Sequence, residues 1–132
     1  MKFKKLLNTL ISLFLVLISN IVLGEWSLYF KDNTSETYID YSSKTVKGDK
    51  VQYVQYTDFP FGVPKDLGQG MSIKYLSEID CKEETIRSLY LVNYRDIKLQ
   101  GGVLSNHDLT STSPSKIIPN TGQSSLMKKL CN

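Results

Sequence analysis

The chain has 132 residues, of which 16 are lysine or arginine and 13 are aspartate or glutamate. Three of the lysines, Lys2, Lys4 and Lys5, lie in the first 24 residues, which hold no acidic residue. The remaining 108 residues therefore carry 13 basic and 13 acidic side chains. A balanced charge without a basic block argues against a nucleic-acid-binding surface, and 108 residues correspond to one domain.

Residues 1–24 have the layout of a secretory signal peptide. A basic start is followed by an apolar stretch up to Leu23, and Gly24 supplies a small residue before Glu25. The alternative is a retained transmembrane anchor, because the stretch is close to the ~18 residues needed to span a bilayer. Polar interruptions favour cleavage, and no cysteine follows the stretch as a lipoprotein anchor would require. We therefore predict a signal peptide over 1–24, a single mature domain over 25–132, and export to the periplasm or cell surface.

The first half of the mature chain has the period of β-strands. Apolar and polar residues alternate over 25–30, 37–41 and 51–58, with polar or glycine-containing turns between them. Trp26, the single tryptophan, lies in the first of these strands, and we expect it to cap the core. Residues 59–70 (FPFGVPKDLGQG) include five prolines or glycines, so we predict a long mobile loop.

The stretch from Met71 to Tyr94 predicts a β-hairpin, because two alternating runs flank a short polar corner that begins at Cys81. The Gly101-Gly102 pair breaks the pattern after the hairpin. Residues 103–115 are polar and rich in serine and threonine, which predicts an irregular or weakly paired segment. Residues 117–118 predict a short last strand before Pro119.

The C-terminal residues predict a short helix. Asn120 followed by Gln123 resembles a capping box, and three apolar residues then share one helical face: Leu126, Met127 and Leu130. A helix of about ten residues is marginal alone, so it must pack against the sheet.

The two cysteines, Cys81 and Cys131, predict one disulfide bond. An exported chain meets an oxidising compartment, where paired cysteines form disulfides. The alternative is two free thiols, as in a cytosolic protein. A bond between these residues would join the hairpin corner to the end of the helix.

The sequence carries no recognisable catalytic or cofactor-binding motif. There is one histidine, His107, so no pair of histidines can hold a metal ion. We expect this loop histidine to be solvated; the alternative is a base beside Asp108 in a small hydrolase. The prediction is a protein that is not an enzyme and that uses no cofactor.

Aromatic residues are the distinctive part of the composition, with eight tyrosines and five phenylalanines. Tyr53 and Tyr56 fall on opposite faces of one predicted strand, and Phe59 and Phe61 lie in the following loop. Tyrosine suits recognition surfaces because its ring is apolar while its hydroxyl stays hydrated. These four residues form the candidate binding surface, and the alternative is that aromatic residues merely favour strands.

The mature chain resembles the surface-adhesin protein E-like family of Gram-negative bacteria. The resemblance lies in a tryptophan strand directly after the signal segment, in Thr37-Tyr38-Ile39-Asp40, and in Glu78-Ile79-Asp80-Cys81. It continues in the tail, where Ile118-Pro119-Asn120-Thr121 precedes the segment that ends at Cys131. The family often has a tryptophan before this proline, and residues 111–115 contain none.

The resemblance implies an α+β fold, with an antiparallel sheet of about six strands and a C-terminal helix tethered across it by a disulfide. It also implies a non-enzymatic binding module, adhesin-like, whose partners are host matrix or plasma proteins or envelope proteins. The alternative function is a structural or accessory subunit of a cell-envelope assembly. No ligand-binding residue is transferred from the family to this chain.

Overall fold

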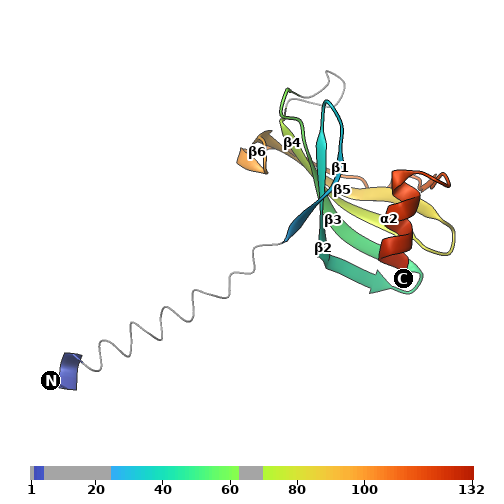
Figure 1. Cartoon of the computed structure of the whole chain (residues 1–132), viewed down its shortest axis with the longest axis horizontal. Coiled ribbons are helices and arrows are strands. Elements are labelled where there is room, and N and C mark those ends of the chain that lie inside the picture. Colours follow the sequence, from blue (N-terminus) through green and yellow to red (C-terminus); the bar gives the residue numbers. More distant parts are fainter. Residues whose placement is uncertain (1, 5–24, 63–69) are drawn as a thin grey trace.

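The computed structural model describes residues 2–4, 25–62 and 70–132 (Figure 1). The apolar part of the predicted signal peptide and the middle of the 59–70 loop lie outside these residues. Six long strands form one antiparallel sheet: β1 (Trp26–Lys31), β2 (Glu36–Lys47), β3 (Lys50–Asp58), β4 (Ser72–Asp80), β5 (Thr85–Asp96) and β6 (Gln100–Asp108). A two-residue strand, β7 (Ser115–Lys116), and the helix α2 (Gly122–Cys131) complete the domain. Within the described ranges, no helix combines the length and the apolar character needed to cross a membrane.

The six strands follow one another across the sheet in chain order, so each pairs with its sequence neighbour. The short strand β7 extends the ladder by pairing with the start of β5, through Ser115 and Lys116. This arrangement confirms the predicted antiparallel sheet of six strands with a C-terminal helix. The hairpin predicted over 71–94 is confirmed as β4 and β5.

The prediction of an irregular or weakly paired segment over 103–115 is wrong for residues 103–108 and confirmed for residues 109–114. Residues 100–108 form β6, which pairs with β5 from Tyr90 to Asp96. The register shifts twice near Tyr94, where Gly101 and Gly102 adopt positive φ. The two glycines therefore absorb a bulge within a continuous strand, where the sequence pattern indicated a break.

The strand predicted over 37–41 extends to Lys47, with a bulge between Asp40 and Thr45. The Ser43 hydroxyl fills the gap in the ladder, because it accepts a hydrogen bond from the Val54 N–H at 2.8 Å and donates one to the Asp40 carbonyl at 2.6 Å. A side chain thus satisfies a backbone donor that the bulge would otherwise leave unpaired.

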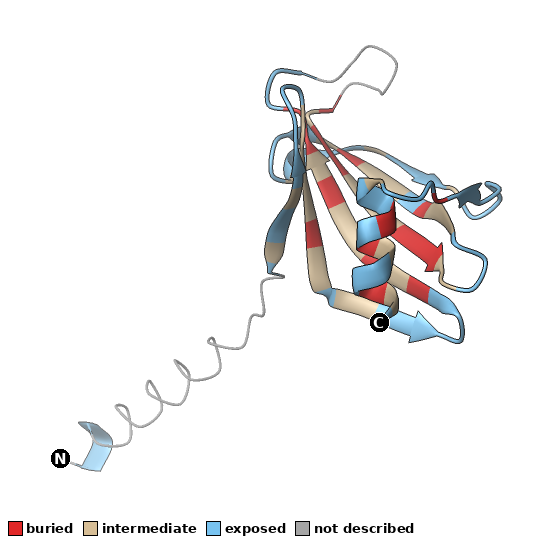
Figure 2. Cartoon of the chain, turned by 45° about the vertical axis from the view of Figure 1, so that its right-hand side comes forward, coloured by how far each residue is buried: buried red, intermediate tan, exposed pale blue. Residues whose placement is uncertain are grey.

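Helix α2 lies across one face of the sheet, as Figures 1 and 2 show from two directions. The core between them is built from sheet residues and the buried leucines of the helix: Ile39, Val51, Tyr53, Ile79, Ile117, Leu126 and Leu130. Met127 packs against the edge of this core. The helix begins after Thr121, whose side chain and that of Ser124 form a reciprocal capping box, so the predicted start at Asn120 was one residue early. Tyr29 donates a hydrogen bond to the Gly122 carbonyl and holds this end of the helix to β1.

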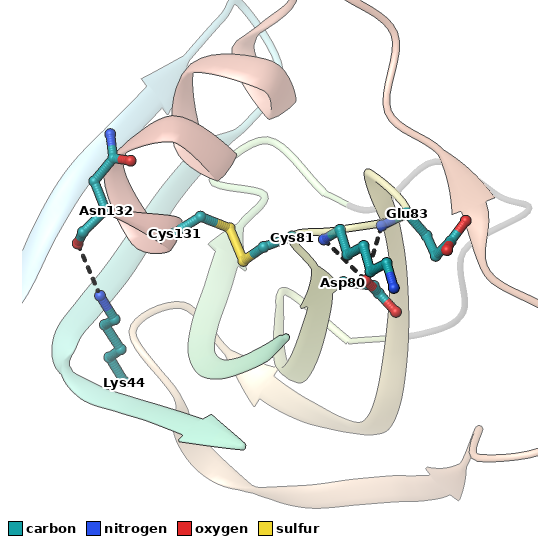
Figure 3. The surroundings of a disulfide bond; sticks show 7 residues. Lys44, Asp80, Cys81, Glu83, Cys131 and Asn132 are labelled. Carbon is teal, nitrogen blue, oxygen red and sulfur yellow. Dashed lines mark hydrogen bonds between the residues drawn. A yellow bond between two sulfur atoms is a disulfide. The ribbon is translucent and has the colours of Figure 1, made fainter. Parts of the chain in front are cut away.

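A disulfide between Cys81 and Cys131 fixes the other end of the helix, with the two Cα atoms 5.9 Å apart (Figure 3). The predicted bond is confirmed, and so is its position at a hairpin corner and a helix end. Two polar contacts reinforce it: Lys44 Nζ donates to the Asn132 carbonyl at 3.4 Å, and Lys129 Nζ lies 4.0 Å from the centre of the Tyr41 ring. Lys44 and Tyr41 both belong to the bulged part of β2, which places them beside the C-terminal end of α2.

Candidate binding surface

The sheet has a covered face and an open face. Directly paired residues of an antiparallel ladder project to the same side, so the register assigns each side chain to a face. Ile39, Tyr53 and Ile79 project toward α2. Their neighbours along each strand project to the opposite side, which α2 does not cover (Figure 2).

Two adjacent rows of side chains form the centre of the open face. The first row runs across five strands through Leu28, Tyr38, Tyr56, Lys74 and Val92. The second row runs beside it through Trp26, Asp40, Val54, Leu76 and Tyr90. We use "open face" for these ten residues. Seven of the ten are half-buried, whereas Leu28 is 54% exposed and Tyr90 is 40% exposed. The face is therefore largely apolar and accessible, with one lysine and one aspartate.

Three aromatic rings at the β1 side make this surface rigid. The Tyr38 and Tyr56 rings are stacked with centroids 4.9 Å apart, and Trp26 meets Tyr56 edge-on at 4.7 Å. Both geometries are favourable for aromatic pairs. Trp26 thus packs on the side of the sheet away from the helix. The prediction that it caps the core is therefore wrong for the core under α2. Tyr56 is buried beneath its two neighbours, and they present the outer ring surface.

The tyrosine hydroxyls of this cluster remain protonated at neutral pH. Burial, together with the negative charge of Asp58, raises the pKa of Tyr56 to about 12. The hydrogen bond that Tyr38 donates to Glu36 Oε2 at 2.8 Å raises the pKa of Tyr38. Both rings therefore act as neutral, apolar surfaces.

Polar groups close one end of the open face. Arg87 donates two hydrogen bonds to Glu78 Oε1, at 3.0 and 3.2 Å, and Gln52 donates one to Glu78 Oε2 at 2.9 Å. Burial opposes ionisation of Glu78, but these donors outweigh it and hold the pKa below its usual range. The cluster is internally satisfied and offers no free charge to a ligand.

The β5–β6 turn closes the other end. Its Lys98 N–H donates to Asp58 Oδ1 at 2.7 Å, and Ser72 links to it by donating to the Asp96 carbonyl at 2.6 Å. Asp58 is buried, and burial raises the pKa of its carboxyl group. Gly70 belongs to the same end, because an added Cβ would lie 2.5 Å from the Tyr94 carbonyl oxygen. This end is a tightly packed backbone junction.

The structure places the four predicted surface residues in different environments. Tyr53 is fully buried under α2, and Phe59 is buried at the end of β3. Tyr56 lies under the aromatic cluster of the open face, while Phe61 is 87% exposed. The four side chains do not form one surface. The opposite orientations predicted for Tyr53 and Tyr56 are confirmed by the register.

Sequence reasoning missed the exposed members of the open face, Leu28 and Tyr90, and the stacking partner Tyr38. Strand periodicity could have grouped Tyr38 with Leu28, since each alternates with a core position. Which face the helix covers depends on pairing between distant strands, and a single sequence does not give it.

His107 is exposed on β6. In the described part of the chain, no group of three or more histidine, cysteine, aspartate or glutamate side chains could hold a metal ion. The open face is thus suited to contact with another molecule through packing.

Comparisons with known proteins agree with the predicted resemblance. The sequence model of the family described as Surface-adhesin protein E matches residues 26–132. Among solved structures, the chain is similar to protein E of Haemophilus influenzae, with a TM-score of 0.56 and 15% identity over 85% of this chain and 86% of that one. At this identity the structural likeness shows the shared fold alone. A comparison with curated proteins gave no match. Since the family match extends over the whole domain from Trp26 to Asn132, this chain belongs to the surface-adhesin protein E family.

Proposed function

We propose that this protein is an exported, adhesin-like binding module that attaches to a protein partner through the open face. The family description supports a surface-adhesin role, and family membership suggests binding in place of catalysis. The finer assignments are also part of the proposal: removal of residues 1–24, and recognition of host matrix or plasma proteins from the cell surface.

One observation carries the proposal: the side of the sheet away from α2 presents apolar and aromatic side chains in two adjacent rows, each of which contains one charged residue. A sheet face that contacts only solvent ordinarily carries polar residues, because residues along each strand alternate between a buried and a solvated face. Here the helix-free face instead carries apolar side chains at four positions: Leu28, Val54, Leu76 and Tyr90. Contiguous apolar surface of this kind marks interaction sites, and rigid aromatic residues lose little entropy when they are covered.

The alternative function is that of an accessory subunit of an envelope assembly. The same face would then be covered permanently by an envelope protein, and the bacterium would not use it for attachment. The two functions predict different partners for one surface, so a single set of variants separates them.

The test replaces the two exposed members of the face together, as Leu28→Ser with Tyr90→Ser. If the two apolar contacts together contribute about 1.4 kcal/mol or more, as interface anchors do, the double variant should bind at least about tenfold more weakly. The matched control is Val46→Ser with Ile118→Ser, which changes two residues that are 60% and 67% exposed and lie outside the open face. Adhesion of cells carrying each variant to matrix-coated and plasma-coated surfaces is measured beside the melting temperature of the purified proteins.

Reduced adhesion of the open-face variant alone, at unchanged melting temperature, supports the adhesin function. Equal adhesion of wild type and both variants overturns it. A photo-crosslinker placed at Leu28 then distinguishes the alternative, because an accessory subunit would give one stoichiometric product with an endogenous envelope protein.

A further inference from the structure

A second surface feature lies on the covered face, away from the open face. A hollow of about 280 Å³ opens between the start of α2, the strand β7 and the central strands. Five uncharged polar side chains line it: Gln55, Ser77, Ser88, Ser115 and Gln123. They come from five elements that are far apart in sequence, and only the folded domain brings them together. We call this the polar hollow.

Hydrogen-bonding capacity in the hollow is unused. Among the described residues, four of these side chains take no part in the hydrogen bonds that join neighbouring groups: Gln55, Ser88, Ser115 and Gln123. The fifth, Ser77, lies close enough to the Tyr53 hydroxyl to lower its pKa. Gln55 and Ser88 are half-buried, and Ser77 is almost fully buried. Ser115 and Gln123 are exposed at the rim, so the five side chains offer donors and acceptors both at the rim and at partly desolvated positions inside it.

A buried hydroxyl beneath the hollow has the same property. Tyr53 pairs directly with Ser77 across the β3–β4 ladder, and its hydroxyl is buried without a hydrogen-bond partner in the described part of the chain. Burial raises the pKa of Tyr53, and the nearby Ser77 side chain partly offsets this rise. Buried polar groups are normally satisfied, so the Tyr53 hydroxyl is an exception next to Ser77, although Tyr53 itself does not line the hollow.

The remaining lining residues restrict the charge of a ligand. Arg87 lines the hollow, but its guanidinium is bound by Glu78 and by the Thr110 carbonyl. The lining includes no carboxylate, and Ile86 supplies one apolar wall. An anion or a cation would find no free opposite charge there. A neutral ligand that carries several hydroxyl groups matches both the polar rim and the apolar wall.

We propose that the polar hollow binds a neutral sugar ring. Its volume corresponds to about nine water molecules at ~30 Å³ each, which is enough for one ring. Ser77, Ser88 and Gln123 would exchange hydrogen bonds with the ring hydroxyls, and Ile86 would contact a C–H face. This site is independent of the open face, so either proposal can fail without the other.

The test titrates isotope-labelled, natively exported protein with glucose, galactose or N-acetylglucosamine, and follows backbone amide shifts by NMR. We expect saturable shifts at Gln55, Ser77, Ser88 and Gln123 with at least one of the three sugars. Ser88→Ala and Gln123→Ala should each weaken the binding by about two- to tenfold, the effect of one lost hydrogen bond. Ser125→Ala and Gln100→Ala, which change exposed residues outside the hollow, are the matched controls and should bind as the wild type does.

Three results would overturn the assignment. The first is the absence of saturable shifts with all three sugars. The second is a set of shifts located elsewhere on the domain. The third is an identical response to acetamide, which would show that the hollow recognises an amide group and not a sugar ring.

Discussion

Cutting the tether at Cys131 provides the sharpest test of how this domain is held together. The disulfide joins residues 50 positions apart. In the chain-entropy description, closing a loop of that length stabilises the folded state by about 4 kcal/mol. With the sheet folded, the bond closes only the segment from Lys116 to Cys131, about 15 residues, so its contribution to helix docking is about 3 kcal/mol, or roughly a hundredfold change in the population of the docked helix. In Cys131→Ser, the helix would keep only its two buried leucines, its cap and the weak contacts at its ends.

We expect Cys131→Ser to free the tail while the sheet remains folded. The sheet has its own ladder of six strands, whereas α2 has ten residues and is otherwise joined to the sheet only by the backbone that follows β7. Trypsin should then cut at Lys128 or Lys129 up to about a hundredfold faster than in the oxidised protein. Amide exchange should accelerate over the same residues before it does so in β3, β4 and β5.

The matched control is Lys44→Ala, which removes the contact with the Asn132 carbonyl but keeps the disulfide. It should leave cleavage close to the wild-type rate, because exposed polar contacts contribute little. Reduced wild-type protein should behave as Cys131→Ser does. If the tail stays resistant to trypsin in both, packing alone holds the helix and the reasoning about the tether is wrong.

Four further predictions concern Phe59 and Phe61, Gly70, Asp58 and the signal peptide. Phe59→Ser should destabilise the fold by about 3–5 kcal/mol, since its ring is buried, whereas Phe61→Ser should change stability by less than about 0.5 kcal/mol; chemical denaturation of the pair measures both. Gly70→Ala should cost about 1–3 kcal/mol in the same assay, because the new Cβ meets a carbonyl oxygen of β5. The pKa of Asp58 is raised in the folded state, so ionisation of this carboxyl group lowers the stability of the fold as the pH rises above its usual pKa. The unfolding free energy of Asp58→Asn should therefore increase relative to that of the wild type between pH 4 and pH 7. A difference in unfolding free energy that stays constant over this range would contradict the prediction. Intact-mass measurement of exported protein should show cleavage after Gly24, and a mass that includes residues 1–24 would refute the signal peptide.

Local sequence patterns were sufficient for the strands whose two faces differ clearly. Lys50–Asp58 and the 71–94 hairpin alternate over most of their length, and both were predicted within a residue or two. The pairing of Cys81 with Cys131 needed only a count of cysteines and the expectation of export. These features depend on near neighbours or on simple exclusion, so no knowledge of the three-dimensional fold was required.

The features that sequence reasoning missed depend on tertiary pairing. Strand β6 carries two glycines and few apolar residues, and it is a strand because β5 offers it a ladder. The end of β2 is extended because Ser43 repairs the bulge. Phe59 looked like a loop residue, but a backbone bond from its N–H to the Met71 carbonyl at 2.8 Å draws the ring inward.

The candidate site was predicted less well than the fold. The sequence showed that tyrosines occur on both faces, but it gave no means to decide which face α2 would cover. Tyr53 and Tyr56 looked equivalent, and the helix buried the first. The partners of Tyr56, Trp26 and Tyr38, come from two other strands, so their convergence is a result of register.

The chain-order arrangement of the strands has a consequence for how the domain folds. Each strand can pair with the one just before it, so the sheet can grow by successive hairpins with short loop closures. Docking of α2 is the long-range exception, since it returns the chain end to β1, to the bulge in β2 and to the corner before β5. The β4–β5 hairpin positions the Cys81 thiol, and Cys131 reaches it only when α2 docks on the sheet. Oxidation then fixes α2 in its docked position, and with two cysteines in the chain there is no wrong intramolecular pairing to correct.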